Sequence, residues 1–160
     1  MLFLLSTGAR LNEALQATWK YIDVDRRVWR IPATNSKSGK VRAVPLNDAA
    51  LGILTKQDTE DEFEHVFINR QTGNPYTTIQ KVWNRLRKAA DLEHVRIHDL
   101  RHQYASFLVN SGRTLYEVQQ ILGHSTSKVT QRYSHLTTAT LQNASASASD
   151  AINEAMKKTA

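Results

Sequence analysis

The sequence predicts an α+β domain that is mainly α-helical and has a small antiparallel β-sheet or hairpin toward its N-terminal side. Several segments repeat apolar residues at helical spacing, and glycines or polar residues separate these segments. Two short runs between residues 28 and 46 are rich in β-branched and aromatic side chains and flank a polar turn, which is typical of a hairpin. The length of 160 residues fits one domain that can bury its own core.

The first half of the chain begins with an apolar segment. Residues 1–7 have no N-cap in front of them, so we expect the end of a helix whose beginning is absent, and hence an N-terminally truncated domain. The spacing of Leu11, Leu15 and Trp19 predicts the next helix. The expected order is helix 1–7, helix 10–19, strand 28–32, strand 41–46 with Lys37 near the hairpin tip, helix 48–55 capped by Asn47, and strand 65–69.

The second half is expected to be helical, and its helices are separated by the breaks Ser111–Gly112 and Gly123–His124. The expected elements are a turn at 71–75, helices near 79–90 (capped by Thr77 or Thr78), 99–111, 114–122 and 126–135, an Ala/Ser-rich linker at 143–149, and a short helix at 150–158. The predicted core includes Leu15, Trp19, Trp83, Phe107, Leu108, Ile121 and Leu122.

Composition excludes several classes of protein. The chain has no cysteine, which excludes disulfides, thiol redox chemistry and thiolate metal sites. No apolar run approaches the roughly 18 residues that would span a bilayer, so we expect a soluble cytoplasmic protein. A net charge of +6 favours a polyanionic partner.

Six polar residues occupy positions that a plain core would not require. Arg10 and Lys37 lie at a helix start and a hairpin tip, while His98 and Arg101 share one helix face. The other two are His124, at a helix break, and Tyr133, nine residues later. Together they predict a cationic pocket around a nucleophilic hydroxyl, which suits attack on a phosphodiester because its transition state gains negative charge.

Each of these residues also has an ordinary structural interpretation. Arg10 and Lys37 could be solvated surface residues, and His98 or His124 could cap a helix. Arg101 could pair with Asp99 or Glu93, and Tyr133 could be a half-buried tyrosine. The six together, at these separations, favour the functional interpretation.

Four motifs make the pattern specific. They are Thr7–Leu15 (TGARLNEAL), Ser36–Leu46 (SKSGKVRAVPL), Ile97–Ser106 (IHDLRHQYAS) and Leu122–His135, which contains LGHST and RYSH. These motifs resemble those of the tyrosine recombinases, the phage integrase family, and they occur in the family's order. The resemblance implies the tyrosine-recombinase catalytic-domain fold, which belongs to the DNA breaking–rejoining enzymes.

The resemblance also implies a role for each residue. Arg10 and Arg101 match the arginines that grip the scissile phosphate. Lys37 matches the general acid that protonates the departing 5′ oxygen, and Lys40 is the nearest alternative on the same hairpin. His98 matches a residue that positions the phosphate and could take the tyrosine proton.

The last two matches complete the implied mechanism. His124 matches the second histidine, which hydrogen-bonds a phosphate oxygen. Tyr133 matches the nucleophile, which forms a 3′-phosphotyrosine whose ester energy allows rejoining without metal, ATP or any other cofactor. Glu13 is expected to support the helix that carries Arg10, and His102 to support the site rather than act in catalysis. Lys81, Arg85, Arg87 and Lys88 are expected to form a solvated face that could also contact DNA phosphates.

The implied partner is double-stranded DNA, with a homotetramer on DNA and a monomer or weak oligomer without it. Residues 1–136 are expected to form the catalytic domain, and residues 137–160 a tail that could dock on a neighbouring subunit. The same resemblance leaves two other functions open. One is a type IB topoisomerase-like relaxation of DNA, and the other is an inactive DNA-binding fragment of an integrase.

Overall fold

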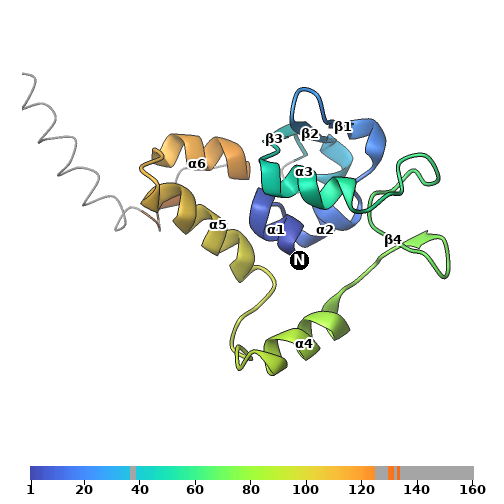
Figure 1. Ribbon diagram of the computed structural model, residues 1–160. Coiled ribbons are helices and arrows are strands. Elements are labelled where there is room, and N and C mark those ends of the chain that lie inside the picture. The colour runs from blue at the N-terminus through green and yellow to red at the C-terminus, as the bar shows by residue number, and fades with distance from the viewer. Residues whose placement is uncertain (37–38, 125–129, 132, 134–160) are drawn as a thin grey trace, which may run out of the picture.

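The computed structural model describes residues 1–36, 39–124, 130–131 and 133. In Figure 1, helices α1, α2 and α3 surround a small sheet. Helices α5 and α6 lie beside this group, and α4 lies apart from it, at the bottom of the view. Helix α1 packs against both α3 and α5, and α6 contacts strand β3. The helices are α1 (Leu2–Thr7), α2 (Leu11–Leu15), α3 (Asp48–Thr55), α4 (Gln80–Ala89), α5 (Asp99–Asn110) and α6 (Leu115–Leu122).

The main sheet is antiparallel and three-stranded, with the order β1 (Ile22–Asp23), β2 (Val28–Ile31) and β3 (Arg42–Pro45). Strands β2 and β3 form the predicted hairpin, and the register pairs Trp29 with Val44. Both of these side chains are buried, because alternate residues of each strand face the core. Strand β1 was not predicted, since two residues are too short to carry a periodic pattern.

Local capping follows the sequence closely at two helices. Asn47 accepts a hydrogen bond from the Ala50 amide at 2.9 Å, which confirms it as the cap of α3. Gly123 ends α6 in the left-handed conformation at φ 64°. At α4 the predicted cap at Thr77 or Thr78 is wrong, because Ile79 occupies the N-cap position; the Thr78 hydroxyl still accepts from the Gln80 amide at 3.2 Å.

The prediction of one helix over 10–19 is wrong, because α2 ends at Leu15 and a short 3₁₀-helix follows at Trp19–Tyr21. The intervening backbone pairs instead with a segment about fifty residues away. The Val66 amide donates to the Ala17 carbonyl, and the Trp19 amide donates to the Glu64 carbonyl. These long-range backbone bonds outweigh the local helical preference.

The strand predicted at 65–69 is shorter than expected, and the turn predicted at 71–75 includes a strand. Strand β4 (Ile68–Asn69) pairs antiparallel with β5 (Asn74–Pro75), so both belong to a small second hairpin. The helix predicted at 126–135 falls largely outside the described residues, as do the linker and helix predicted beyond 137.

Two clusters form the core. The first joins α1 and α3 to the sheet, and the second joins α5, α6 and Tyr133. Leu15, Trp83 and Leu122 are buried as predicted, whereas Trp19, Leu108 and Ile121 are half-buried. The prediction for Phe107 is wrong, since that side chain is 51% exposed. Helix α5 buries Arg101, Ala105 and Val109, and residue 107 lies on the opposite face.

Gly8 is one position where the fold requires a glycine. Its φ is +62°, and an added Cβ would lie 2.4 Å from Tyr104 Cδ1 and 2.7 Å from Leu122 Cδ2. We expect Gly8→Ala to lower the free energy of unfolding by about 2–4 kcal/mol through backbone strain and overpacking, as urea unfolding would measure. Gly52→Ala is the matched control, because nothing lies within 4 Å of its Cβ position inside α3, and a gain of about 0.5–1 kcal/mol is expected. Equal effects at the two glycines would contradict this account.

Candidate active site

The turn between α1 and α2 positions Arg10. Arg10 occupies the N-cap of α2 with extended backbone angles, and its amide donates to Glu13 Oε2 at 2.8 Å. The Arg10 guanidinium donates through Nη1 to Glu13 Oε1 at 2.8 Å. The carboxylate therefore fixes both the backbone and the side chain of Arg10, which confirms the supporting role predicted for Glu13.

A second arginine, Arg42 of β3, binds the same carboxylate. Its Nη2 donates to Glu13 Oε2 at 2.5 Å, and its Nη1 donates to the Ile121 carbonyl at 2.7 Å. A Cβ on Gly123 would lie 2.1 Å from Arg42 Cδ, so the end of α6 can approach this side chain only because residue 123 is glycine. Arg42 thereby links the hairpin to α2 and to the turn that precedes His124. Sequence reasoning missed Arg42, although it lies inside the second motif.

Arg101 of α5 is held between two distant backbone segments. Its Nη1 donates to the Gly8 carbonyl and its Nη2 to the Leu122 carbonyl, both at 2.6 Å. The residue is only 4% exposed. The alternative pairing with Asp99 or Glu93 is absent among the described contacts, and Asp99 pairs with Arg96 instead. These bonds fix the guanidinium beside the turn that carries Arg10.

The cluster has an excess of positive charge. Burial lowers the pKa of Arg101 to about 9, and nearby Arg10 and Arg42 act in the same direction. Burial also lowers the pKa of Arg42, partly offset by Glu13, and the pKa of His98 falls through burial and the adjacent His102 and Arg101. The guanidiniums of Arg10 and Arg42 share the Glu13 carboxylate, and that of Arg101 lies within range of both, so a bound anion would relieve their mutual repulsion.

Tyr133 completes the cluster from the C-terminal side. It is 5% exposed, and its hydroxyl oxygen lies 2.5 Å from Nδ1 of His102. The charge of an ionised Tyr133 would raise the pKa of Arg101, so the phenol lies within electrostatic range of that guanidinium. The His98 ring meets the His102 ring edge-on, with centroids 4.8 Å apart. The i, i+3, i+4 spacing of 98, 101 and 102 was the sequence signal that could have placed His102 on this face.

The remaining candidates lie along the hairpin and the end of α6. Nδ1 of His124 lies 2.9 Å from the Thr130 hydroxyl, in the segment that leads to Tyr133. His124 also lines a hollow of about 800 Å³ together with Lys40 and Arg42. Lys37 lies outside the described residues.

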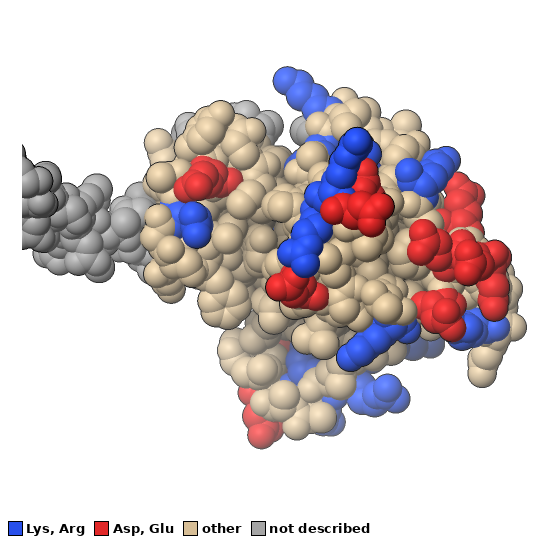
Figure 2. All heavy atoms as spheres, turned by 45° about the horizontal axis from the view of Figure 1, so that its top comes forward, with Lys and Arg blue, Asp and Glu red and all other residues tan. Residues whose placement is uncertain are grey.

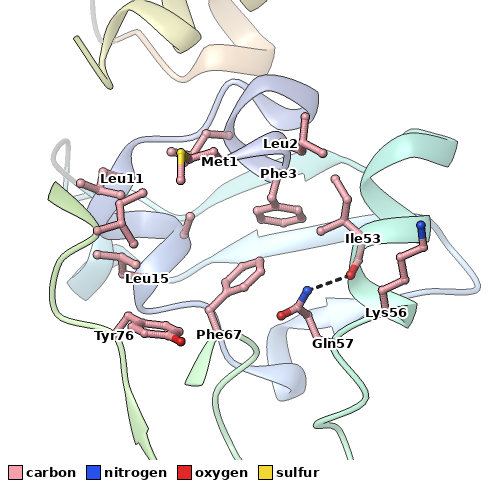
Figure 3. Close-up of a pocket in the computed structure, with 13 residues that line it drawn as sticks. Met1, Leu2, Phe3, Leu11, Leu15, Ile53, Lys56, Gln57, Phe67 and Tyr76 are labelled. Carbon is pink, nitrogen blue, oxygen red and sulfur yellow. Dashed lines mark hydrogen bonds between the residues drawn. The ribbon is translucent and has the colours of Figure 1, made fainter. Parts of the chain in front are cut away.

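Two further hollows, each of about 490 Å³, differ in chemistry. One is lined by Arg10, Ser36 and His98, and it lies between the start of α2, the hairpin and the start of α5. The other, shown in Figure 3, is lined by apolar side chains of α1, α2 and α3 with Phe67 and Tyr76. Arg10 and His98 line the first and no candidate residue lines the second, so of these two the polar hollow is the one suited to a phosphate.

Two other kinds of site were sought in the part of the chain that the structure describes. No group of three or more His, Asp or Glu side chains there is arranged to hold a metal ion. No helix there is long and apolar enough to cross a membrane.

The fold and the cationic cluster around a tyrosine define the class of tyrosine recombinase catalytic domains. The chain belongs to the phage integrase family, whose model matches residues 1–140. It is 33% identical over 146 residues to the integrase of Salmonella phage P22, covering 84% of this chain and 38% of that protein. The chain therefore spans less than half the length of this relative.

Solved structures confirm the predicted fold. The catalytic domain of bacteriophage HP1 integrase superposes with a TM-score of 0.65 at 27% identity, covering 88% of this chain and 75% of that domain. XerH recombinase in its pre-cleavage complex with difH superposes with a TM-score of 0.68 at 28% identity, covering 89% of this chain and 43% of that one.

Proposed function

We propose that this domain cleaves and rejoins DNA strands in site-specific recombination, through a covalent 3′-phosphotyrosine at Tyr133. The observation that carries the proposal is the position of the Tyr133 hydroxyl, 2.5 Å from His102 Nδ1 on the helix that carries Arg101, and within electrostatic range of that guanidinium. Such a cluster favours an anion and stabilises the charge that develops on a phosphate under attack.

In the cleavage step, the Tyr133 oxygen bonds to phosphorus while the bond from phosphorus to the 5′ oxygen breaks. Arg10 and Arg101 neutralise the non-bridging oxygens, and His124 donates a hydrogen bond to one of them. Lys37 protonates the departing 5′ oxygen, a role that rests on its place in the sequence motif. Each lost donor to the transition state costs roughly 3–4 kcal/mol, by analogy with other oxyanion sites.

Double-stranded DNA is the proposed substrate, and the XerH–difH complex supports this choice through its similar fold. Figure 2 shows acidic and basic side chains interspersed on one face, so that face is not a continuous basic surface. The exposed basic residues of α4, which are Lys81, Arg85 and Lys88, supply a local set of cations for DNA phosphates, while Arg87 is half-buried and donates to the Val95 carbonyl.

The assembly is also proposed from the family. Residues 1–136 would act as the catalytic domain, in a homotetramer on DNA that separates into monomers or weak oligomers without it. Residues 137–160 would dock on a neighbouring subunit. The phage and bacterial origin of the relatives supports action in the bacterial cytoplasm.

A suicide substrate tests the proposal without knowledge of the target site. The probe is a library of duplexes with a random central sequence, each nicked close to the position where cleavage would occur. Cleavage releases a short fragment that diffuses away, so the covalent protein–DNA adduct accumulates and runs as a shifted band on a denaturing gel. We expect such a band, and peptide mass spectrometry should place the nucleotide on Tyr133.

Two results would overturn the proposal. An adduct on another residue would remove Tyr133 as nucleophile. The absence of any adduct, with DNA binding retained in a gel-shift assay, would favour an inactive DNA-binding fragment. Sequencing the captured DNA would define the preferred site, and relaxation of supercoiled plasmid without any site preference would favour the topoisomerase-like activity.

A further inference from the structure

We propose that His102 is a catalytic residue, which accepts the phenolic proton of Tyr133 when the phosphotyrosine bond forms. This inference rests on the proposed function, because it assigns the proton of the same nucleophile. It also differs from the sequence-based expectation, in which His98 could take that proton and His102 only supports the site.

The two histidines at the start of α5, His98 and His102, differ in their position relative to the Tyr133 hydroxyl. Nδ1 of His102 lies 2.5 Å from the Tyr133 oxygen, which is within direct hydrogen-bond reach. His98 lies one turn earlier, meets the edge of the His102 ring, and lines the polar hollow beside Arg10. His98 is thus placed toward the proposed phosphate, and His102 toward the phenol.

The packing of His102 favours a fixed role. Its ring contacts the Tyr133 ring at a centroid distance of 6.1 Å as well as the His98 ring, and its carbonyl accepts from the Ser106 hydroxyl at 3.1 Å. Among the residues that the structure describes, the charged and titratable groups that interact with the pair include His98, Asp99 and Arg101 on the same helix. Because these contacts hold the His102 ring next to the Tyr133 oxygen, the ring needs no rearrangement before it accepts the proton.

The proton balance is complete. A neutral imidazole protonated on Nε2 offers its Nδ1 lone pair to the phenol. As the Tyr133 oxygen bonds to phosphorus, its proton moves to Nδ1 and His102 becomes a cation, while the departing 5′ oxygen takes a proton from Lys37. Rejoining reverses both transfers, so His102 returns the proton to the phenol.

His102→Asn tests the role, because an asparagine amide can occupy the position of Nδ1 but cannot accept a proton near neutral pH. The initial rate of adduct formation on the suicide library would be measured between pH 5.5 and 10. At pH 7 we expect a loss of about 10²–10⁴-fold relative to the unmodified chain. The matched control is His94→Asn, since His94 is exposed, and it should keep the original rate.

The pH profile separates a proton acceptor from a residue that only positions the phenol. The rate of the unmodified chain should reach a plateau once the His102 imidazole is neutral, because a neutral ring can accept the proton. The rate of His102→Asn should instead keep rising with pH, by about tenfold per pH unit while the phenol is mostly protonated, because the ionised phenol no longer needs a base. A slow variant with the original profile would overturn the proposal, as would a variant with the original rate.

A measurement without DNA distinguishes failure of this inference from failure of the proposed function. In protein labelled with ¹³C at tyrosine Cζ, the Tyr133 resonance should shift as His102 titrates, and this shift should vanish in His102→Asn. A Tyr133 resonance that does not respond to His102 would overturn the inference, even if the adduct forms. If the unmodified chain forms no adduct while the resonance responds, the proposed function fails instead.

Discussion

Replacing Tyr133 with phenylalanine is expected to abolish the covalent adduct while leaving the domain folded. The change removes one oxygen atom, which is the atom that would bond to phosphorus. The aromatic ring remains packed in the cluster with Val109, Val118 and Leu122, so the core keeps its volume. The lost hydrogen bond to His102 should lower the free energy of unfolding by only about 0.5–1.5 kcal/mol.

The adduct assay and urea unfolding of the same preparation measure both effects. Tyr116→Phe is the matched control, because the Tyr116 side chain is 69% exposed on α6 and lies outside the second core cluster. That control should form the adduct at the original rate. An adduct that survives in Tyr133→Phe would show that a different side chain attacks the phosphate.

Glu13→Ala is expected to cause a large loss of stability, about 3–5 kcal/mol, because it leaves a buried guanidinium without its counter-ion. The Glu13 side chain is 1% exposed and that of Arg42 is 6% exposed, so water cannot replace the lost partner. The change also removes the acceptor that fixes the Arg10 guanidinium and amide. Adduct formation should therefore fall as well, since the phosphate-binding arginine loses its position.

A double-mutant cycle isolates the buried pair. Arg42→Met removes the cation and keeps an apolar side chain of similar length, so Glu13→Gln combined with Arg42→Met should be more stable than the sum of the single changes predicts. Urea unfolding of the four proteins gives the coupling energy, which we expect to exceed about 1 kcal/mol. Additive effects would show that the two charges do not stabilise each other, contrary to the 2.5 Å contact.

The helices of the second half and the main hairpin were predictable because their signals are local. Apolar periodicity, caps such as Asn47 and breaks such as Gly123 lie within a few residues of the elements they define. The errors in element boundaries occurred where backbone segments pair, either locally in the β4–β5 hairpin or over long range. The backbone of residues 17–19 is not helical, because it forms hydrogen bonds with the backbone of residues 64–66. The local sequence around residues 17–19 gives no sign of this distant partner.

Most of the candidate site was also predictable from the sequence, because its motifs are local too. Arg10, His98, Arg101, His124 and Tyr133 carry motifs that can be recognised one segment at a time. Among the described residues, Arg10, His98, Arg101 and Tyr133 lie close enough for their charges to interact: Arg10 and Arg101 lower the pKa of His98, and Tyr133 acts on the pKa of Arg101. It also adds Arg42, whose acceptor on α6 lies 79 residues away, a separation that motif order does not reveal.

The sequence by itself determined the family, the chemical types in the site and the order of the elements, because these follow from motifs and from short-range periodicity. The tertiary structure decided which groups meet. It seats Arg101 between the Gly8 and Leu122 carbonyls, and it joins Arg10 to Arg42 through one buried carboxylate. It also turns the Tyr133 hydroxyl toward His102, since hydrogen-bond partners are selected by packing in three dimensions.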